Sequence, residues 1–182
     1  MTQRAPSLPA EERRAAIVAA TLPLLLERGA AVSTKQIAEA AGIAEGTIFR
    51  VFPDKDAVVR AAVELAFDPD QTERALEAID HDLAFEDQLV EAVRVMQRRG
   101  AVIWRLVQTV GDQDMPKTPP TDFAALAKLF EPHRHNIRLD PVAAARQLRA
   151  LTLAVSHPIF VNDDPMEPTD IVSLLLDGMR NR

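Results

Sequence analysis

Residues 34–52 read TKQIAEAAGIAEGTIFRVF, the pattern of two short helices separated by a glycine turn. Ala38 is small enough for the second helix to cross the first closely, and Gly42 supports the tight turn between them. An apolar interior shared by the two helices would contain Ile37, Ala41, Ile43, Ile48 and Phe52. The segment therefore has helix-turn-helix spacing.

The second of these helices leaves several residues on faces that need not be buried. Small residues at its N-terminal end would let the backbone approach a DNA groove, and polar side chains there can reach base edges. These positions are Ala44, Glu45, Gly46, Thr47, Phe49 and Arg50. A plain helical hairpin has the same spacing, so the pattern alone leaves both interpretations open.

Helical signals continue on either side of this segment. A helix is expected over 9–28, bent or divided at Pro23, with Gly29 as a left-handed cap. Ser33 or Thr34 can cap the next helix, and a further helix over 44–52 should end before Pro53. Asp54 can cap a fourth helix that runs to about residue 67.

With these flanking helices, residues 9–67 resemble the DNA-binding region of the tetracycline-repressor (TetR) family of bacterial regulators. Glu45 departs from the family pattern, in which a basic or small polar residue is frequent there, and Val51 stands where an aromatic residue is common. The positions that agree with the pattern are Thr34, Gly42, Gly46, Thr47, Phe49, Phe52 and Lys55. The resemblance implies a three-helix DNA-binding part and a larger helical part that binds an effector and dimerises through its last two helices.

Each candidate contact has a chemical reason. Thr34 and Lys55 can contact phosphate, and Thr47 can reach phosphate or a thymine methyl group. Arg50 can pair with guanine or phosphate, whereas Glu45 either accepts from a cytosine amino group or has a simple surface role. The predicted DNA-contact residues are Thr34, Lys35, Ala44, Glu45, Gly46, Thr47, Phe49, Arg50 and Lys55. Arg4 is a weaker candidate, as a minor-groove arm.

Composition agrees with a folded helical protein. The 182 residues are 47% hydrophobic and 26% charged, which excludes disorder for most of the chain. Residues 1–60 carry a net charge of +1 and residues 61–182 one of −7, so the overall charge of −6 belongs to the C-terminal part. The absence of cysteine excludes disulfides and thiolate sites and suits a reducing compartment, so we expect the cytoplasm.

The rest of the chain also predicts helices, which gives an all-α fold with a DNA-binding domain over 1–60 and an effector-binding and dimerisation domain over 61–182. The longest expected helix spans 85–110 and would be central to the second domain. Further helices are expected over 72–79, 122–130, 141–156 and 168–179, with loops over 112–121 and 158–168.

The second domain offers two kinds of apolar surface. An effector pocket between helices would use bulky residues with a few polar neighbours, although core packing has the same signature. The candidates are Met96, Trp104, Arg105, Gln108, Phe123, Leu126 and Gln147. A four-helix interface between two copies would use Leu148, Leu151, Val155, Ile171, Leu174 and Leu175 from the last two helices.

Catalysis has no support in this sequence. The six glycines form no phosphate-binding loop, and neither a cofactor nor a metal is predicted. His133 and His135 lack a matched third metal ligand, and His157 is expected to cap or pack. The expected function is transcriptional regulation, most often repression. We expect a homodimer that binds a palindromic operator and responds to a small, mainly apolar effector. The alternative is a helical protein-interaction module without sequence-specific DNA binding.

Overall fold

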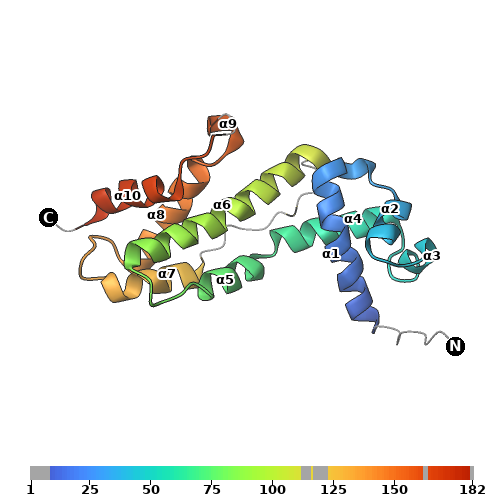
Figure 1. Ribbon diagram of the computed structural model, residues 1–182, viewed down its shortest axis with the longest axis horizontal. Helices are drawn as coiled ribbons and strands as arrows, with labels where there is room; N and C mark the ends of the chain where they lie inside the picture. Colours follow the sequence, from blue (N-terminus) through green and yellow to red (C-terminus); the bar gives the residue numbers. More distant parts are fainter. Residues whose placement is uncertain (1–8, 112–115, 117–122, 162–163, 181–182) are drawn as a thin grey trace. The chain divides into compact units, whose positions relative to one another are not determined.

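The computed structural model describes residues 9–111, 116, 123–161 and 164–180 (Figure 1). Every named element in these ranges is helical, and Ile137 and Arg180 form an isolated antiparallel bridge. The chain packs into two units, of which the first contains residues 1–67 and 105–117 and the second residues 68–104 and 118–182. The first cut, after residue 67, falls at the end of the helix Lys55–Phe67, inside which the predicted boundary after residue 60 lies; a second cut, after residue 104, falls inside the helix Phe85–Val110.

The first unit begins with helix α1, Ala10–Arg28, which continues through Pro23 without a break. Gly29 follows with φ 59 and ψ −150, so its φ is positive as predicted, but its ψ lies outside the left-handed helical region and the predicted left-handed cap is wrong. A Cβ built on Gly29 would lie 2.4 Å from the carbonyl oxygen of Thr109, so only glycine fits there. Arg105 Nε donates to the Leu26 carbonyl at 2.8 Å, which ties the end of α6 to the end of α1.

Helices α2 (Thr34–Ala40), α3 (Glu45–Ile48) and α4 (Lys55–Phe67) complete the first unit. Gly42 has φ 65 in the turn between α2 and α3, as its place in the motif requires. Of the predicted interior residues, Ile37, Ile48 and Phe52 are buried, whereas Ala41 and Ile43 are half-buried. Figure 1 shows α1 to α4 together at the blue and cyan end of the chain.

Helix α3 is shorter than the sequence predicted. The expected helix over 44–52 is a single α-helical turn, followed by turns in which the Arg50 and Val51 amides donate to carbonyls three residues earlier. Gly46 and the β-branched residues around it have low helix propensity, and Pro53 disfavours helical geometry at Phe52. The segment is therefore compact and helical in outline without being one continuous α-helix.

The second unit contains α5 (Pro69–Glu77), α7 (Ala124–Phe130), α8 (Pro141–Ala154), α9 (Pro158–Val161) and α10 (Pro168–Met179), together with the larger part of α6 (Phe85–Val110). The predicted limits of α6 are confirmed. Two predicted boundaries were wrong: the helix expected over 72–79 is α5, which begins earlier, at Pro69, and the loop expected over 158–168 contains α9.

The first of these corrections has a clear local cause. The Asp68 side chain accepts from the Asp70 amide at 3.0 Å, and Pro69 occupies the first position of α5. A side-chain cap followed by proline is a standard helix start, so α5 begins at Pro69 and not at residue 72. Similarly, Pro158 opens the short helix α9.

The core of the second unit is formed by one side of each longer helix. Leu89 and Met96 of α6, Leu148 of α8 and Ile171 of α10 are buried within a single apolar cluster. Arg99 joins α6 to the start of α5, because its guanidinium donates to the Asp68 carbonyl and the Thr72 hydroxyl. Burial lowers the pKa of Arg99, and the charge of Asp68 opposes that shift.

Within the described ranges, no helix has both the length and the apolar character needed to cross a membrane.

Candidate nucleic-acid interface

The start of α2 is held by two hydrogen-bonded pairs. Ser33 forms a capping box with Gln36, in which the Ser33 hydroxyl accepts from the Gln36 amide and the Gln36 side chain accepts from the Ser33 amide. The Thr34 hydroxyl donates to the carboxylate of Glu45, the first residue of α3. This bond brings the N-terminal ends of α2 and α3 together on one surface.

Six of the nine predicted DNA-contact residues are exposed. They are Lys35, Ala44, Glu45, Gly46, Phe49 and Arg50. Phe49 is notable among them, since 53% of this large apolar side chain is exposed although Phe52, three residues later, is only 2% exposed. Phe49 therefore belongs to the outer surface of the motif.

The other three, Thr34, Thr47 and Lys55, are half-buried. Lys55 opens α4, and its ammonium donates to the Ala30 carbonyl at 3.0 Å. Asp54 caps the same helix as predicted, because its carboxylate accepts from the Ala57 amide at 2.7 Å. One Lys55 donor thus connects α4 to the segment before α2, and a lysine ammonium has two further donors for another partner.

A buried aromatic residue supports this surface from behind. The Arg14 guanidinium lies 4.4 Å from the centre of the Phe52 ring, in a cation–π arrangement between α1 and the end of the motif. The buried side chains Ile37 and Ile48 fill the space between α2 and α3. Packing on one side therefore leaves the candidate contact residues on the other.

The predicted effector residues are divided between the two units. Arg105 and Gln108 belong to the first unit, while the other five belong to the second. Met96 is buried in the core, Trp104 packs edge-on against His157 with ring centres 4.9 Å apart, and Gln147 is exposed. Phe123 and Leu126 do line a pocket, together with Ala124, Ala127, Val142, Ala145, Arg146 and Arg149.

The α8 residues that line this pocket were not predicted. Arg146 and Arg149 are spaced i, i+3 and follow the small and apolar residues Val142 and Ala145, so all four share one face of the helix. This spacing was the one feature of the sequence that could have indicated the α8 side of the pocket. It has meaning only when α7 is known to pack on this face of α8.

The predicted interface residues divide between core and surface. Leu148, Ile171 and Leu175 are buried within their own chain, and Leu151 and Val155 are partly buried against the same core. Leu174 is 55% exposed. Among the described residues of α8 and α10, Val142 and Leu153 are the other large apolar side chains with substantial exposure.

The histidines have structural partners. His133 stacks on Phe85 with ring centres 3.9 Å apart, and His157 Nδ1 accepts from the Ile159 amide at 3.2 Å, at the start of α9. In the part of the chain that the structure describes, no three metal-ligating side chains gather in one place. Arg4 lies outside the described residues.

Comparison with protein families gives a match over the first unit. Residues 17–62 match the model described as bacterial regulatory proteins, tetR family. The matched range includes α2, α3 and most of α4, and therefore all nine predicted DNA-contact residues. Among curated protein sequences, none matches the chain.

Solved structures match over nearly the whole length. A TetR-family transcriptional regulator from Mesorhizobium loti aligns with a TM-score of 0.63 at 18% identity, covering 96% of this chain and 100% of its own. A TetR regulator from Streptomyces coelicolor gives 0.57 at 22%, covering 92% and 98%. NalD of Pseudomonas aeruginosa, the secondary repressor of the MexAB-OprM multidrug efflux pump, gives 0.54 at 21%, covering 94% and 98%.

Proposed function

We propose that the chain, which belongs to the TetR family of bacterial regulatory proteins, represses transcription from a palindromic operator. Members of this family are DNA-binding transcriptional regulators and not enzymes. In this proposal the chain binds DNA as a homodimer in the cytoplasm, and a small, mainly apolar effector bound in the second unit changes its affinity for DNA. Family membership favours this function over the protein-interaction module that the sequence had left open.

One observation carries the proposal. All nine candidate contact residues are at least partly accessible, and the Thr34–Glu45 and Lys55–Ala30 hydrogen bonds connect the segments that present them. We assign Arg50 to a base or phosphate, and Thr34, Lys35 and Lys55 to phosphates. Ala44, Gly46, Thr47 and Phe49 form the remaining surface near the groove.

A fixed surface of this kind suits groove recognition. Phosphate contacts set the register of a protein on DNA, and base contacts then read the sequence. The capping box at Ser33 and the cap at Asp54 fix the starts of α2 and α4, so their neighbouring side chains are pre-oriented. Two copies related by twofold symmetry would read an inverted repeat.

Selection of bound sequences from a random DNA pool tests the proposal. The full chain should enrich an inverted repeat, and Arg50→Ala should weaken binding to it by about 1–3 kcal/mol. Loss of preference at a single position in each half-site would identify a base contact. Arg74→Ala, which removes the same charge from an exposed position on α5, is the matched control and should leave affinity unchanged. Enrichment of no sequence would refute operator recognition.

A further inference from the structure

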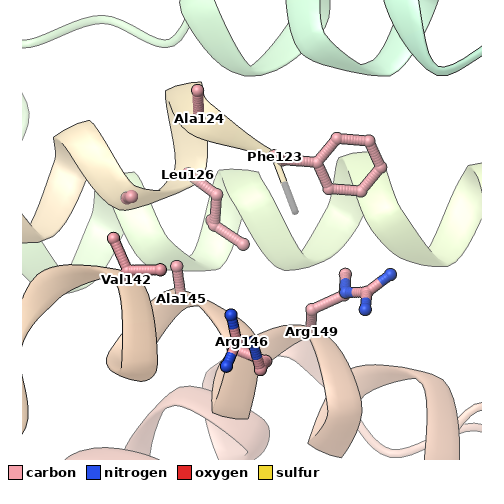
Figure 2. Close-up of a pocket in the computed structure, with 8 residues that line it drawn as sticks. Phe123, Ala124, Leu126, Val142, Ala145, Arg146 and Arg149 are labelled. Atoms are coloured by element: carbon pink, nitrogen blue, oxygen red, sulfur yellow. The ribbon is translucent and has the colours of Figure 1, made fainter. Parts of the chain in front are cut away.

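The second unit has a pocket between α7 and α8 with a volume of about 190 Å³. Phe123, Ala124 and Leu126 come from the α7 side, and Val142, Ala145, Arg146 and Arg149 come from α8, as Figure 2 shows. The lining is thus mostly apolar, with two guanidinium groups one helical turn apart at one part of it.

The apolar part of the pocket has a simple origin. Three of its lining residues are alanines, which leave space between α7 and α8 that larger side chains would fill. Phe123 and Leu126 are buried at 9% and 1% exposure, so the pocket adjoins the core of the unit. An aliphatic or aromatic body is the chemistry that such a surface favours.

Arg149 gives the pocket its polar chemistry. Its Nε is buried and donates no hydrogen bond within the described chain. Glu73 of α5 reaches the start of α7, where its Oε1 accepts from the Ala125 amide at 2.7 Å, while its Oε2 is buried and, like Arg149 Nε, has no hydrogen-bond partner among the described residues. A buried guanidinium donor without an acceptor is unfavourable, and a carboxylate is the acceptor whose geometry it matches best.

We propose that this pocket binds amphipathic monocarboxylates, with the apolar body against Phe123 and Leu126 and the carboxylate on Arg149, beside Arg146. The inference deepens the proposed function, on which its regulatory meaning rests, because it names the chemical class of the effector. Arg149 sets specificity in this account: it favours an acid over a neutral molecule with the same apolar body.

Calorimetric titration of the DNA-free full chain tests the pocket independently of DNA. The probes are octanoate and 1-octanol, which share a chain length and differ in charge, each below the concentration at which it aggregates. Octanoate should bind at least tenfold more tightly than 1-octanol. Equal affinities, or no binding of octanoate, would overturn the proposal.

Two variants locate the site. Arg149→Met keeps most of the apolar stem and removes the charge, so it should weaken octanoate binding at least tenfold and leave 1-octanol unchanged. Because the Nε has no partner to lose, the melting temperature should not fall. Arg94→Met, an exposed α6 arginine paired with Glu91, is the control and should bind octanoate like the wild type. Unchanged octanoate binding in Arg149→Met would reject the assignment.

Ala127→Leu provides a second variant, since it adds volume to the pocket from a half-buried position on α7. It should weaken both probes together. The two proposals fail separately: octanoate binding that depends on Arg149 in a chain that enriches no DNA sequence would refute the regulator, whereas operator binding without octanoate selectivity would refute the pocket chemistry.

Discussion

Glu45 places a negative charge on the surface that we propose faces DNA, and its carboxylate accepts from the Thr34 hydroxyl. Glu45→Gln retains an acceptor for Thr34 and removes the charge. For a phosphate about 7 Å away in water, the repulsion relieved is about 0.6 kcal/mol. We therefore expect about threefold tighter binding both to the selected operator and to unrelated DNA, measured by fluorescence anisotropy.

The exposed carboxylate of Glu64 on α4 supplies the control for this change, and Glu64→Gln should bind like the wild type. If Glu45→Gln instead lost its preference at one base pair, Glu45 would be a reader of cytosine, the other role that its chemistry allows.

Lys55 has a partner within the protein and a proposed partner on DNA. Lys55→Met removes the bond to the Ala30 carbonyl, and we expect a loss of about 0.5–1.5 kcal/mol in unfolding free energy. It should also weaken binding to all DNA sequences and lower the slope of log affinity against log salt by about one. Denaturant titration and a salt series measure the two effects; an unchanged salt slope would make Lys55 purely structural.

A substitution at Gly46 should affect protein stability and DNA binding in opposite directions. Gly46 lies within α3, and a Cβ built on it meets nothing within 4 Å. Gly46→Ala should stabilise the fold by about 0.5–1 kcal/mol through helix propensity. It should nevertheless weaken operator binding, since the added methyl group would lie where the backbone is proposed to approach DNA. A variant that is both more stable and equally tight in binding would place Gly46 away from the groove.

Element boundaries were predictable where the signals are local. The apolar spacing of α6, the Asp54 cap and the positive φ at Gly42 all follow from residues close in sequence. The length of α3 was overestimated because apolar spacing at Ile48 and Phe52 is satisfied equally well by tighter turns. The start of α5 was expected at residue 72 and lies at Pro69, because an Asp-Pro pair can either end one helix or begin the next.

The DNA-contact surface and the pocket between α7 and α8 also differ in how far local sequence predicts them. The DNA-contact residues follow one another within a short motif, so the sequence placed them together. The pocket instead depends on the packing of α7 against α8, and nothing in the local spacing of Arg149 indicates that its Nε is buried. Three leucine and isoleucine positions proposed for a dimer interface are buried in the chain's own core for a related reason, since periodicity marks an apolar face without naming its partner.

Two turn glycines allow the cost of an unfavourable backbone conformation to be compared with the added cost of a steric clash. Both have positive φ, but a Cβ on Gly42 would have open space, while one on Gly29 would overlap the Thr109 carbonyl. Gly42→Ala should therefore cost about 1–2 kcal/mol in unfolding free energy, from backbone strain alone. Gly29→Ala should cost clearly more. Equal losses in denaturant titrations would show that Thr109 moves away freely.

Assembly of the whole molecule is tested by adjacent leucines on α10. Leu174 is 55% exposed and Leu175 only 7%. We propose that Leu174 contributes to the dimer, so Leu174→Glu should give a folded monomer by light scattering and lose operator binding. Leu175→Glu buries a charge in the core and should cost more than about 3 kcal/mol in folding. A wild type that is monomeric at micromolar concentration would refute the dimer.

The end of α6 belongs to the first unit, although residues 68–104 of the second unit precede it in the chain. A ribosome therefore completes α1 to α4 well before it makes Arg105 and Thr109, which contact the end of α1. Until Arg105 and Thr109 are made, the turn at Gly29 lacks part of its packing, even though the helix-turn-helix motif is already complete. A message that ends before codon 105 would yield the entire helix-turn-helix motif without the segment that supports it.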